Sequence, residues 1–473
     1  MMGAEYNPED LPGAVPAPEK QKPRFADGPK PQLAAEGAKS QAEQEPGFAE
    51  EEPGLNWLFV DLNSYFASVE QQVQPHLRGR PIVVVPAMVD TTCCIAASYE
   101  AKAYGIRTGT IVGEAKRMCP DLILVEGRHD LYTDVHHRIV KAVDSYLPVT
   151  AVLSIDEMAC RLMGPQRSLP AAIELGHKIK AHIQDEAGLM LRSSIGIATN
   201  RYLAKIASDM EKPDGLVALP RDILPDALRQ LTLRDLPGIG RRMEKHLNEQ
   251  GIRTMEDLLA LDFDQAGAVW GSVLGERLWH WLRGESFDAA ETEHLKSLSH
   301  QHVLAPEMRS PEKGWGAAVK LLHKAAMRLR NNDLWAGEIG LVVGIAPKDR
   351  DLAVSSFGAP ARGWKGKVRL SECQDNQTLM AALRGLWESR PTGGEYDRPY
   401  FIGVHLNQLV PDALHTLILF DATEESLERS RLQKTMDALN QKYGLTTLAP
   451  ASMLAAYRAA PTRIAFHSVP ELF

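Results

Sequence analysis

The order of strand and helix patterns between residues 55 and 197 constrains the fold of this chain most strongly. An apolar run from Leu55 ends at Asp61, and the residues after it repeat apolar side chains at helical spacing. Further patterns predict a helix, two strands joined as a hairpin, a helix and a strand, at 130–146, 151–155, 158–163, 171–186 and 191–197. This order predicts a split βαβ, ferredoxin-like sheet with an insertion after its first strand and helix.

Two further folded regions follow this sheet. Residues 227–284 carry helical patterns, the first two of which are joined by a Leu-Pro-Gly-Ile-Gly turn at 236–240. Residues 297–409 alternate strand and helix patterns again, and a charged helix pattern covers 424–443. The predicted fold class is therefore α+β with several domains.

The acidic charge of the chain is concentrated at its beginning. The whole chain has 53 basic and 61 acidic residues, a net charge of −8, whereas residues 1–54 alone hold 11 acidic and 5 basic residues, a balance of −6. This segment also holds nine of the 30 prolines and few large apolar residues, so we expect a disordered acidic tail. The remaining balance of −2 leaves a nucleic-acid partner possible. The tail itself is more simply explained as a solvated spacer without a partner.

Cysteine spacing and hydropathy limit the compartment. The five cysteines show no C-x-x-C spacing, which fits neither a disulfide framework nor a zinc site. No apolar run approaches the roughly 20 residues of a bilayer span, and no signal pattern opens the chain. We therefore expect a protein of the reducing cytoplasm with no membrane segment.

Three carboxylates mark the ends of predicted core strands. Asp61 ends the first strand, and Asp156 and Glu157 occupy the predicted hairpin. If these strands are neighbours in the sheet, the carboxylates converge, and hard oxygen ligands of this kind hold Mg²⁺ at phosphates. Taken alone, the Asp-Glu pair is more simply explained as a solvated turn.

Several basic groups are candidates for phosphate contacts. Tyr99, Lys102 and Lys205 could hold a triphosphate, although a single lysine is more often a solvated surface residue. The glycines Gly238 and Gly240 allow a tight turn whose N–H groups can face a phosphate, as in a helix-hairpin-helix, or they can serve a plain αα-hairpin.

A basic strand is expected in the second α+β region. Lys365, Lys367 and Arg369 recur at period two and therefore share one face of a strand. Residues 296–410 contain 16 basic and 11 acidic residues, a balance of +5. This pattern favours a surface that follows a nucleic-acid backbone, and an ordinary exposed strand face is the alternative.

Taken together, these motifs resemble the Y-family translesion DNA polymerases, and within that family the bacterial DNA polymerase IV branch. The resemblance runs from about Leu55 to Leu409 with its motifs in the family's order. The stretches that carry it are Phe59 to Glu70 (FVDLNSYFASVE), Ala97 to Lys102 (ASYEAK), Ser154 to Glu157 (SIDE), Leu203 to Asp209 (LAKIASD), Lys212 to Gly215 (KPDG) and the hairpin from Pro237 to Gly240.

The resemblance implies a right-hand polymerase architecture. It places a ferredoxin-like palm at 55–63 and 127–217, fingers at 64–126, a helical thumb with a helix-hairpin-helix at 218–290, a linker at 291–296 and an α+β little-finger domain at 297–410. A C-terminal tail then covers 411–473. The implied substrates are primer–template DNA and dNTPs, and the protein is expected to be a monomer.

The resemblance also implies roles for individual residues. Asp61 and Asp156 would ligate two Mg²⁺ ions, Glu157 the ion near the primer 3′-hydroxyl and the Leu62 carbonyl the ion bound to the nucleotide. Phe66 would be the steric gate against ribonucleotides; without the family context it is a core aromatic. In the same way Tyr99, Lys102 and Lys205 would contact the triphosphate, and Gly238, Gly240, Lys365, Lys367 and Arg369 the DNA.

Three features depart from the polymerase IV pattern. Asn63 stands where that branch has an acid, and Lys102 replaces an arginine, as in the catalytic subunit of polymerase V. A lysine lacks the planar fork of arginine, so its grip on a triphosphate differs. The segment 415–420, with Leu419 and Phe420, only roughly matches a sliding-clamp peptide and can also be an ordinary strand; residues 470–473 are a second candidate.

The implied activity is a template-dependent, low-fidelity DNA polymerase for translesion synthesis. One alternative is a non-catalytic, polymerase-like adaptor that binds DNA and recruits partners, but such family members lack the metal carboxylates. A nucleotide cyclase is a third possibility because that class resembles the palm. The helix-hairpin-helix argues against a cyclase.

Overall fold

The computed structural model describes residues 54–90, 92–286, 295–345, 362–415, 424–443, 447–449 and 451. The described residues form two compact units, one up to residue 286 and the other from residue 295 onward. The predicted acidic tail at 1–54 lies outside the described residues apart from its last residue, and so do Leu419 and Phe420. Among the described residues, no helix is long and apolar enough to pass through a bilayer.

A five-stranded sheet forms the centre of the first unit. Its strands are β5 (Val149–Val152), β6 (Glu157–Arg161), β1 (Trp57–Leu62), β7 (Ser193–Ala198) and β8 (Leu216–Leu219), in that spatial order. Neighbours are antiparallel except β7 and β8, which are parallel. The first four strands have the predicted ferredoxin-like order, whereas β8 was not expected.

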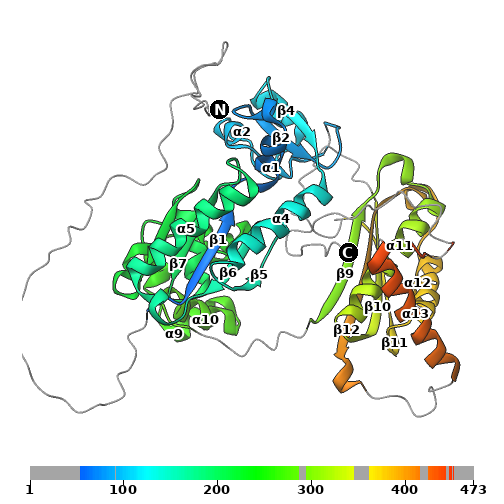
Figure 1. Ribbon diagram of the computed structural model, residues 1–473. Coiled ribbons are helices and arrows are strands. Elements are labelled where there is room, and N and C mark those ends of the chain that lie inside the picture. Colours follow the sequence, from blue (N-terminus) through cyan, green and yellow to red (C-terminus); the bar gives the residue numbers. More distant parts are fainter. Residues whose placement is uncertain are drawn as a thin grey trace, which may run out of the picture. The chain divides into compact units, whose positions relative to one another are not determined.

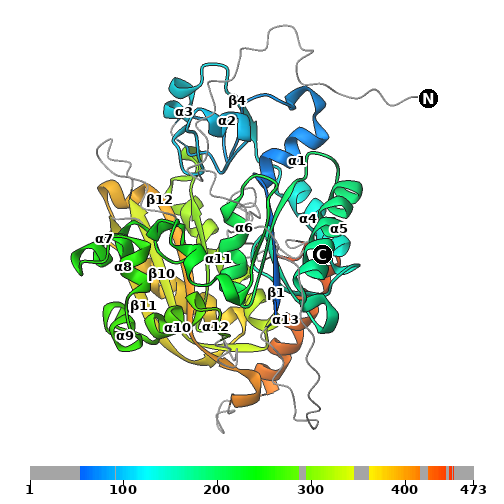
Figure 2. The same ribbon diagram turned by 90° about the vertical axis from the view of Figure 1, so that its left-hand side faces the viewer.

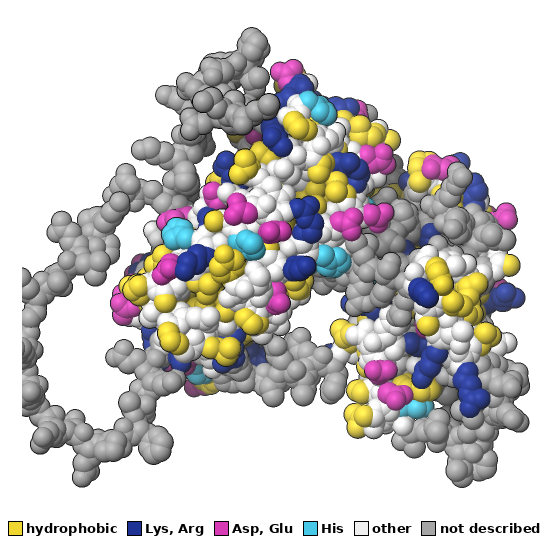
Figure 3. Space-filling model, in the orientation of Figure 1, with side chains coloured by type: hydrophobic (Ala, Val, Ile, Leu, Met, Phe, Trp, Pro, Cys, Tyr) yellow, Lys and Arg dark blue, Asp and Glu magenta, His cyan; other side chains and the backbone are white. Residues whose placement is uncertain are grey.

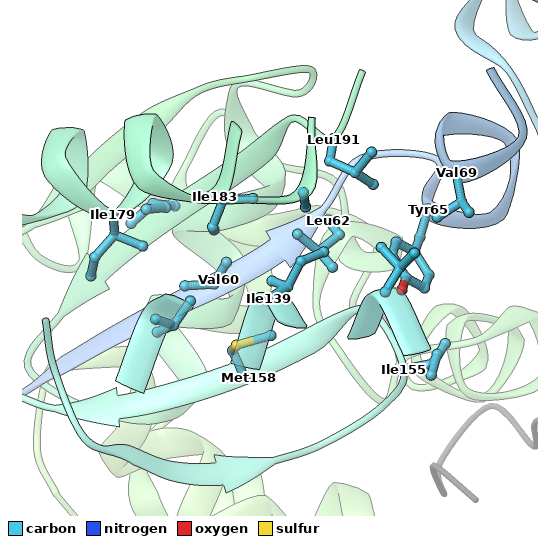
Figure 4. Close-up of a cluster of buried hydrophobic side chains, with 14 of the residues drawn as sticks. Val60, Leu62, Tyr65, Val69, Ile139, Ile155, Met158, Ile179, Ile183 and Leu191 are labelled. Atoms are coloured by element: carbon cyan, nitrogen blue, oxygen red, sulfur yellow. The ribbon is translucent and has the colours of Figure 1, made fainter. Parts of the chain in front are cut away.

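One face of this sheet is covered by two long helices, α4 (His129–Asp144) and α5 (Leu169–Ala187) (Figure 1). Val60 and Leu62 of β1 point to this face, because residues two apart along a strand share a side. They pack in the close-up with Ile139 of α4 (Figure 4). This core fixes the position of β1 within the sheet.

The opposite face of the sheet packs against α6 (Arg201–Met210) and the helical region that follows it. Trp57 and Phe59 belong to this second core, so the alternation places Asp61 on the same side. All six residues of β1 are buried, as expected for a central strand covered on both faces. Asp61 is therefore a buried acid on the face that α6 covers.

An insertion between β1 and α4 carries its own small sheet. It contains α1 (Tyr65–Val73), the 3₁₀ helix η2 (Pro75–Leu77), β2 (Ile82–Val85), β3 (Ala96–Ala97), α2 (Tyr99–Ala103), α3 (Val112–Met118) and β4 (Ile123–Glu126). The β-branched run from Thr92 to Ala97 predicts a strand, but only its last two residues form β3, and Cys93 makes an isolated bridge with Ile111. The interpretation of residues 64–126 as fingers stays a prediction.

The helical region of the first unit begins with short elements before the turn at 236–240. They are three 3₁₀ helices, η4 (Arg221–Ile223), η5 (Asp226–Leu228) and η6 (Leu233–Asp235), so the helical pattern expected before the turn takes the 3₁₀ form. Prolines at 220, 225 and 237 interrupt a longer helix there. The helices that follow are α7 (Arg241–Glu249), α8 (Met255–Leu259), α9 (Phe263–Trp270) and α10 (Val273–Leu282).

The second unit is a four-stranded antiparallel sheet with helices packed against it (Figure 2). In spatial order its strands are β11 (Gly363–Cys373), β10 (Leu334–Ile345), β12 (Pro399–Pro411) and β9 (Ser297–Val303), and its helices are α11 (Pro311–Asn331), α12 (Asn376–Ser389) and α13 (Glu424–Tyr443). The alternation of strands and helices expected over residues 297–409 is present, and α13 has the bounds expected for the charged helix at 424–443. The short 3₁₀ helices η3 (Gly164–Arg167), η7 (Pro306–Met308), η8 (Gly394–Asp397) and η9 (Asp412–Leu414) complete the described elements.

Candidate active site

The predicted carboxylates meet at one edge of the central strands. Asp61 at the end of β1 lies directly opposite Glu157 at the start of β6 in the antiparallel register. The N–H of Leu62 donates to the backbone carbonyl of Asp156 at 2.8 Å, which fastens the β5–β6 turn to the end of β1. Residues directly opposite each other share a face, so Glu157 joins Asp61 on the α6 side.

Two lysines come between these carboxylates. Lys205 of α6 places its Nζ 2.6 Å from Asp61 Oδ2 and 2.7 Å from Glu157 Oε1. Lys212, two residues after α6, places its Nζ 2.7 Å from Asp61 Oδ1. Asp209 contacts both lysines, at 3.2 Å and 2.7 Å, so Asp61, Lys205, Asp209 and Lys212 form a closed charge ring.

The negative charge of the carboxylates shifts nearby pKa values. Burial raises the pKa of Asp156 to about 6; the Ser154 hydroxyl, which donates to its Oδ1 at 2.6 Å, opposes the shift, and the charges of Asp61 and Glu157 add to it. Burial alone would lower the pKa of Lys205, but the surrounding carboxylates raise it above its ordinary value. The site therefore favours added positive charge.

The carboxylate and carbonyl oxygens of this site are of the kind that binds Mg²⁺. In the structure, the ammonium groups of Lys205 and Lys212 lie against Asp61. In the part of the chain that the structure describes, no three acidic, imidazole or thiol side chains converge at metal-binding distance. Positive charge nevertheless lies between Asp61 and Glu157, in the form of the Lys205 ammonium. Carboxylate and carbonyl oxygens are the hard ligands that Mg²⁺ prefers, so the assignment to Asp61, Leu62, Asp156 and Glu157 stays a prediction.

Tyr99 and Lys102 approach the same carboxylates from the insertion. Both lie on α2, and the Lys102 Nζ sits 4.4 Å from the centre of the Tyr99 ring. Burial raises the pKa of Tyr99 to about 12, and the charge of Asp61 adds to the effect. Burial lowers the pKa of Lys102, and so does the neighbouring charge of Lys212. These two predicted nucleotide contacts therefore belong to the same electrostatic site as the charge ring.

Phe66 lies on α1, four residues after the end of β1. Its ring is only partly buried and stacks on Tyr132 of α4. A partly exposed aromatic ring on the helix that directly follows β1 is consistent with the predicted gate, and its role stays a prediction.

Asn63 and Lys212 are site residues to which no role was assigned from the sequence. Asn63 is buried, and its amide bonds to Ser194 and to the backbone of Asp214. The pattern Lys212 to Gly215 was part of the resemblance, but nothing in the linear sequence shows that Lys212 reaches Asp61. The signal that could have found it is its place directly after a helix whose Lys205 and Asp209 face the same strand.

The predicted DNA contacts are divided between the two units of the chain. Gly238, with φ +92°, and Gly240 form the turn before α7, and a Cβ atom added at either position would meet no atom within 4 Å. Lys365, Lys367 and Arg369 are all exposed on β11, and Lys367 pairs with Glu338 at 3.0 Å. Charged side chains of both signs are interspersed over the visible surface of the first unit (Figure 3). These surfaces stay predicted DNA contacts.

Comparison with known families gives three consecutive matches. Residues 60–209 match the impB/mucB/samB family, residues 234–286 match a domain described as DNA polymerase-iota, thumb domain, and residues 295–418 match the impB/mucB/samB family C-terminal domain. The first match contains Asp156, Glu157 and three of the four charge-ring residues; the fourth, Lys212, lies just beyond its end.

Curated relatives and a solved structure agree with these matches. A protein named DNA polymerase IV from Moorella thermoacetica is 33% identical over 394 residues, which cover 82% of this chain and 93% of that protein. One of the same name from Pelotomaculum thermopropionicum is 30% identical, over 84% and 96% of the two chains. The fold resembles that of a solved Y-family DNA polymerase chimera, with a TM-score of 0.58 and 23% identity over 75% of this chain and 99% of the other. The chain therefore belongs to the Y family of translesion DNA polymerases.

Proposed function

We propose that this chain extends a primer on a DNA template by two-metal catalysis at Asp61, Asp156 and Glu157. One observation carries the proposal: the register of β1 and β6 sets Asp61 opposite Glu157, while Leu62 is bonded to the Asp156 backbone. Acids on neighbouring central strands are held by the sheet and need no flexible loop to bring them together.

Two Mg²⁺ ions bound by these oxygens would activate the primer 3′-hydroxyl and stabilise the charge that develops on the transferred phosphate. The protein supplies three fixed carboxylates, and the Leu62 carbonyl is a fourth oxygen-bearing group at the same strand end. Burial beside two other acids makes ionised Asp156 unfavourable without a neighbouring cation, which favours binding of a divalent ion.

The incoming dNTP would be held by cations and by aromatic rings. Lys205 and Lys212 contact Asp61, and Lys102 lies within the electrostatic reach of Asp61, so the three cations can neutralise a triphosphate placed there. The hydroxyl of Tyr99 adds a neutral donor at neutral pH. Phe66 would lie under the sugar, where its ring excludes a ribose 2′-hydroxyl.

DNA would be bound through its backbone. The turn at Gly238 and Gly240 leaves the start of α7 unobstructed for a phosphate, and the exposed cations of β11 add a sequence-independent attraction. Docking to a sliding clamp through Leu419 and Phe420, a monomeric state and a cytoplasmic location remain expectations from the sequence.

The test is primer extension with Mg²⁺ and dNTPs on undamaged and abasic templates. Asp156→Ala is compared with the native protein and with Asp185→Ala, which removes an exposed acid of α5. We expect the native protein and Asp185→Ala to extend the primer and Asp156→Ala to lose extension while it still binds DNA.

Two outcomes contradict the proposal in different ways. Extension that survives in Asp156→Ala would remove this residue from the catalytic centre. DNA binding without extension by the native protein would favour a non-catalytic adaptor instead.

A further inference from the structure

The inference concerns Asn63, the buried residue that follows β1. It is 3% exposed, and each end of its side-chain amide has a partner. The Nδ2 group donates to Ser194 Oγ at 3.0 Å, and the Oδ1 atom accepts from the backbone N–H of Asp214 at 2.8 Å. The first bond anchors the amide to β7, and the second extends it to the loop after α6.

That loop, residues 212–215, is held from a second side by Lys180 of α5. The Lys180 Nζ pairs with Asp214 Oδ1 at 2.9 Å and donates to the Gly215 carbonyl at 3.1 Å. Asp214 has φ +62°, a conformation that few non-glycine residues adopt and that needs support from its surroundings. Asn63 and Lys180 together supply this support.

The position of this loop determines where Lys212 lies. Its Nζ is 2.7 Å from Asp61 Oδ1 and 2.7 Å from Asp209 Oδ1, whereas Lys205 approaches the other oxygen of Asp61. A displacement of the loop by about 1 Å would break these contacts, and misplacement on this scale is costly in an active site.

An amide at position 63 can anchor the loop without adding charge. Its two ends differ, so it donates to Ser194 and accepts from Asp214 at the same time. A carboxylate in the same place would add a negative charge two residues from Asp61. The neutral side chain adds no further acid to compete for Lys205 and Lys212, which already pair with Asp61 and Asp209.

We infer that Asn63 is a positioning residue: it holds the 212–215 loop so that the Lys212 ammonium faces the polyphosphate of the incoming nucleotide. This inference rests on the proposed polymerase function, because it assumes that a nucleoside triphosphate binds beside Asp61. Asn63 itself does not touch the nucleotide and acts through Lys212.

The test measures dNTP affinity in the absence of chemistry. The complex is formed with a primer that ends in a dideoxynucleotide, and the Kd of the matching dNTP is titrated in the presence of Mg²⁺. We expect Asn63→Ala to raise this Kd by roughly fivefold to tenfold, the effect of a lost hydrogen bond and a displaced cation. The Kd for the primer–template alone is expected to stay unchanged.

A matched control is available at the other end of β1. Asn56 precedes the strand and donates from its Nδ2 to the Thr199 carbonyl at 2.9 Å. Asn56→Ala therefore removes a comparable amide bond far along the strand from Asp61, and we expect it to lower the melting temperature without changing the dNTP Kd.

A double mutant separates positioning from a general loss of structure. If Asn63 acts through Lys212, Asn63→Ala combined with Lys212→Ala binds dNTP no more weakly than Lys212→Ala alone. Additive effects of the two substitutions on the dNTP Kd, or an unchanged Kd in Asn63→Ala, would overturn this inference but leave the proposed polymerase function intact. A native complex that binds no dNTP would overturn the proposed function together with it.

Discussion

The ring of Phe66 stacks on the ring of Tyr132, with centroids 4.3 Å apart and planes inclined by 15°. The hydroxyl of Tyr132 donates to Glu70 Oε1 at 2.7 Å, and Glu70 lies on α1 one helical turn after Phe66. Arg128 also pairs with the fully buried Glu70 carboxylate, and the Tyr65 hydroxyl donates to the Tyr132 carbonyl at 2.7 Å. Three residues of α1, Tyr65, Phe66 and Glu70, therefore contact Tyr132 of α4. These contacts fix the orientation of the Phe66 ring.

The first prediction concerns sugar selection. The stack on Tyr132 holds the Phe66 ring in one orientation. Phe66→Ala removes that ring and leaves its space open. We expect discrimination between dNTP and rNTP to fall by at least about tenfold, measured as the ratio of kcat/KM values. Phe66→Tyr, which keeps the ring, is the control. Unchanged discrimination in Phe66→Ala would place the gate elsewhere.

The second prediction concerns the contact between β7 and α6. A Cβ atom on Gly196 would lie 2.0 Å from the Ala204 carbonyl oxygen and 2.3 Å from the Ser208 nitrogen, both in the backbone of α6. Gly196→Ala must therefore push away the helix that carries Lys205. We expect the free energy of unfolding to fall by about 2 to 3 kcal/mol in urea titrations, with a loss of primer extension.

Gly385→Ala is the matched control for this substitution. Gly385 is an exposed position within α12, and an added Cβ there would meet no atom within 4 Å. Alanine restricts the unfolded chain and favours helix, so we expect a gain of about 0.5 to 1 kcal/mol. A Gly196→Ala protein as stable as the native one would contradict the close packing of α6 on β7.

Strand and helix periodicity predicted most of the fold because each core element has one strong pattern. The sheet order around β1 followed from the sequence of patterns, whereas the register that sets Asp61 opposite Glu157 is known only from the structure. Phe59 and Asp61 are two residues apart along the strand and therefore lie on the same face of the sheet. The sequence could thus have indicated that Asp61 shares a face with Phe59.

Elements that depend on contacts distant in sequence were missed. β8 is a short run whose strand character comes from its parallel partner β7, and Cys93 leaves the expected strand to pair with Ile111. The approach of Lys212 to Asp61 requires the bond between Asn63 and Asp214, which are 151 positions apart. Periodicity within a short window cannot indicate a bond of that span.

The third prediction concerns the basic face of β11. Replacing Lys365, Lys367 and Arg369 by Gln removes three exposed cations from one strand face. If they lie on phosphates, DNA binding weakens and the slope of log Kd against log salt concentration falls by about 2 to 3, since each phosphate contact contributes roughly 0.9. Fluorescence anisotropy at several salt concentrations measures this slope.

The control for the β11 triple variant removes the same charge elsewhere in the second unit. Arg431, Lys434 and Lys442 are exposed on α13, and replacing all three by Gln changes the net charge equally. We expect a smaller change in slope for this α13 variant. Equal slopes in both variants would show that net charge alone, and not the face of β11, determines DNA affinity.

The fourth prediction concerns His136, which is buried behind the turn that carries Asp156. Its Nδ1 lies 2.8 Å from the Ile155 carbonyl, and burial lowers its pKa from 6.5 to about 4, with the charge of His137 as a smaller cause. The unfolded chain therefore takes up a proton near pH 6.5, whereas the folded chain does so only near pH 4. Stability is fully present above pH 6.5 and is lost as the pH falls through this window, because the unfolded state binds more protons there.

When the pH falls from 7 to 5, protonation of His136 in the unfolded chain lowers the free energy of unfolding by about 2 kcal/mol. A glutamine can still donate to the Ile155 carbonyl but does not titrate, so His136→Gln should lose less stability over the same interval than the native protein. The partly buried histidines of the second unit, His300 and His323, are present in both proteins and cancel in this comparison. Urea unfolding at pH 7 and pH 5 measures the loss of stability in each protein. His76→Gln, which replaces an exposed histidine, is the control. Equal losses in the native protein and His136→Gln would mean that His136 is charged in the folded state at pH 5.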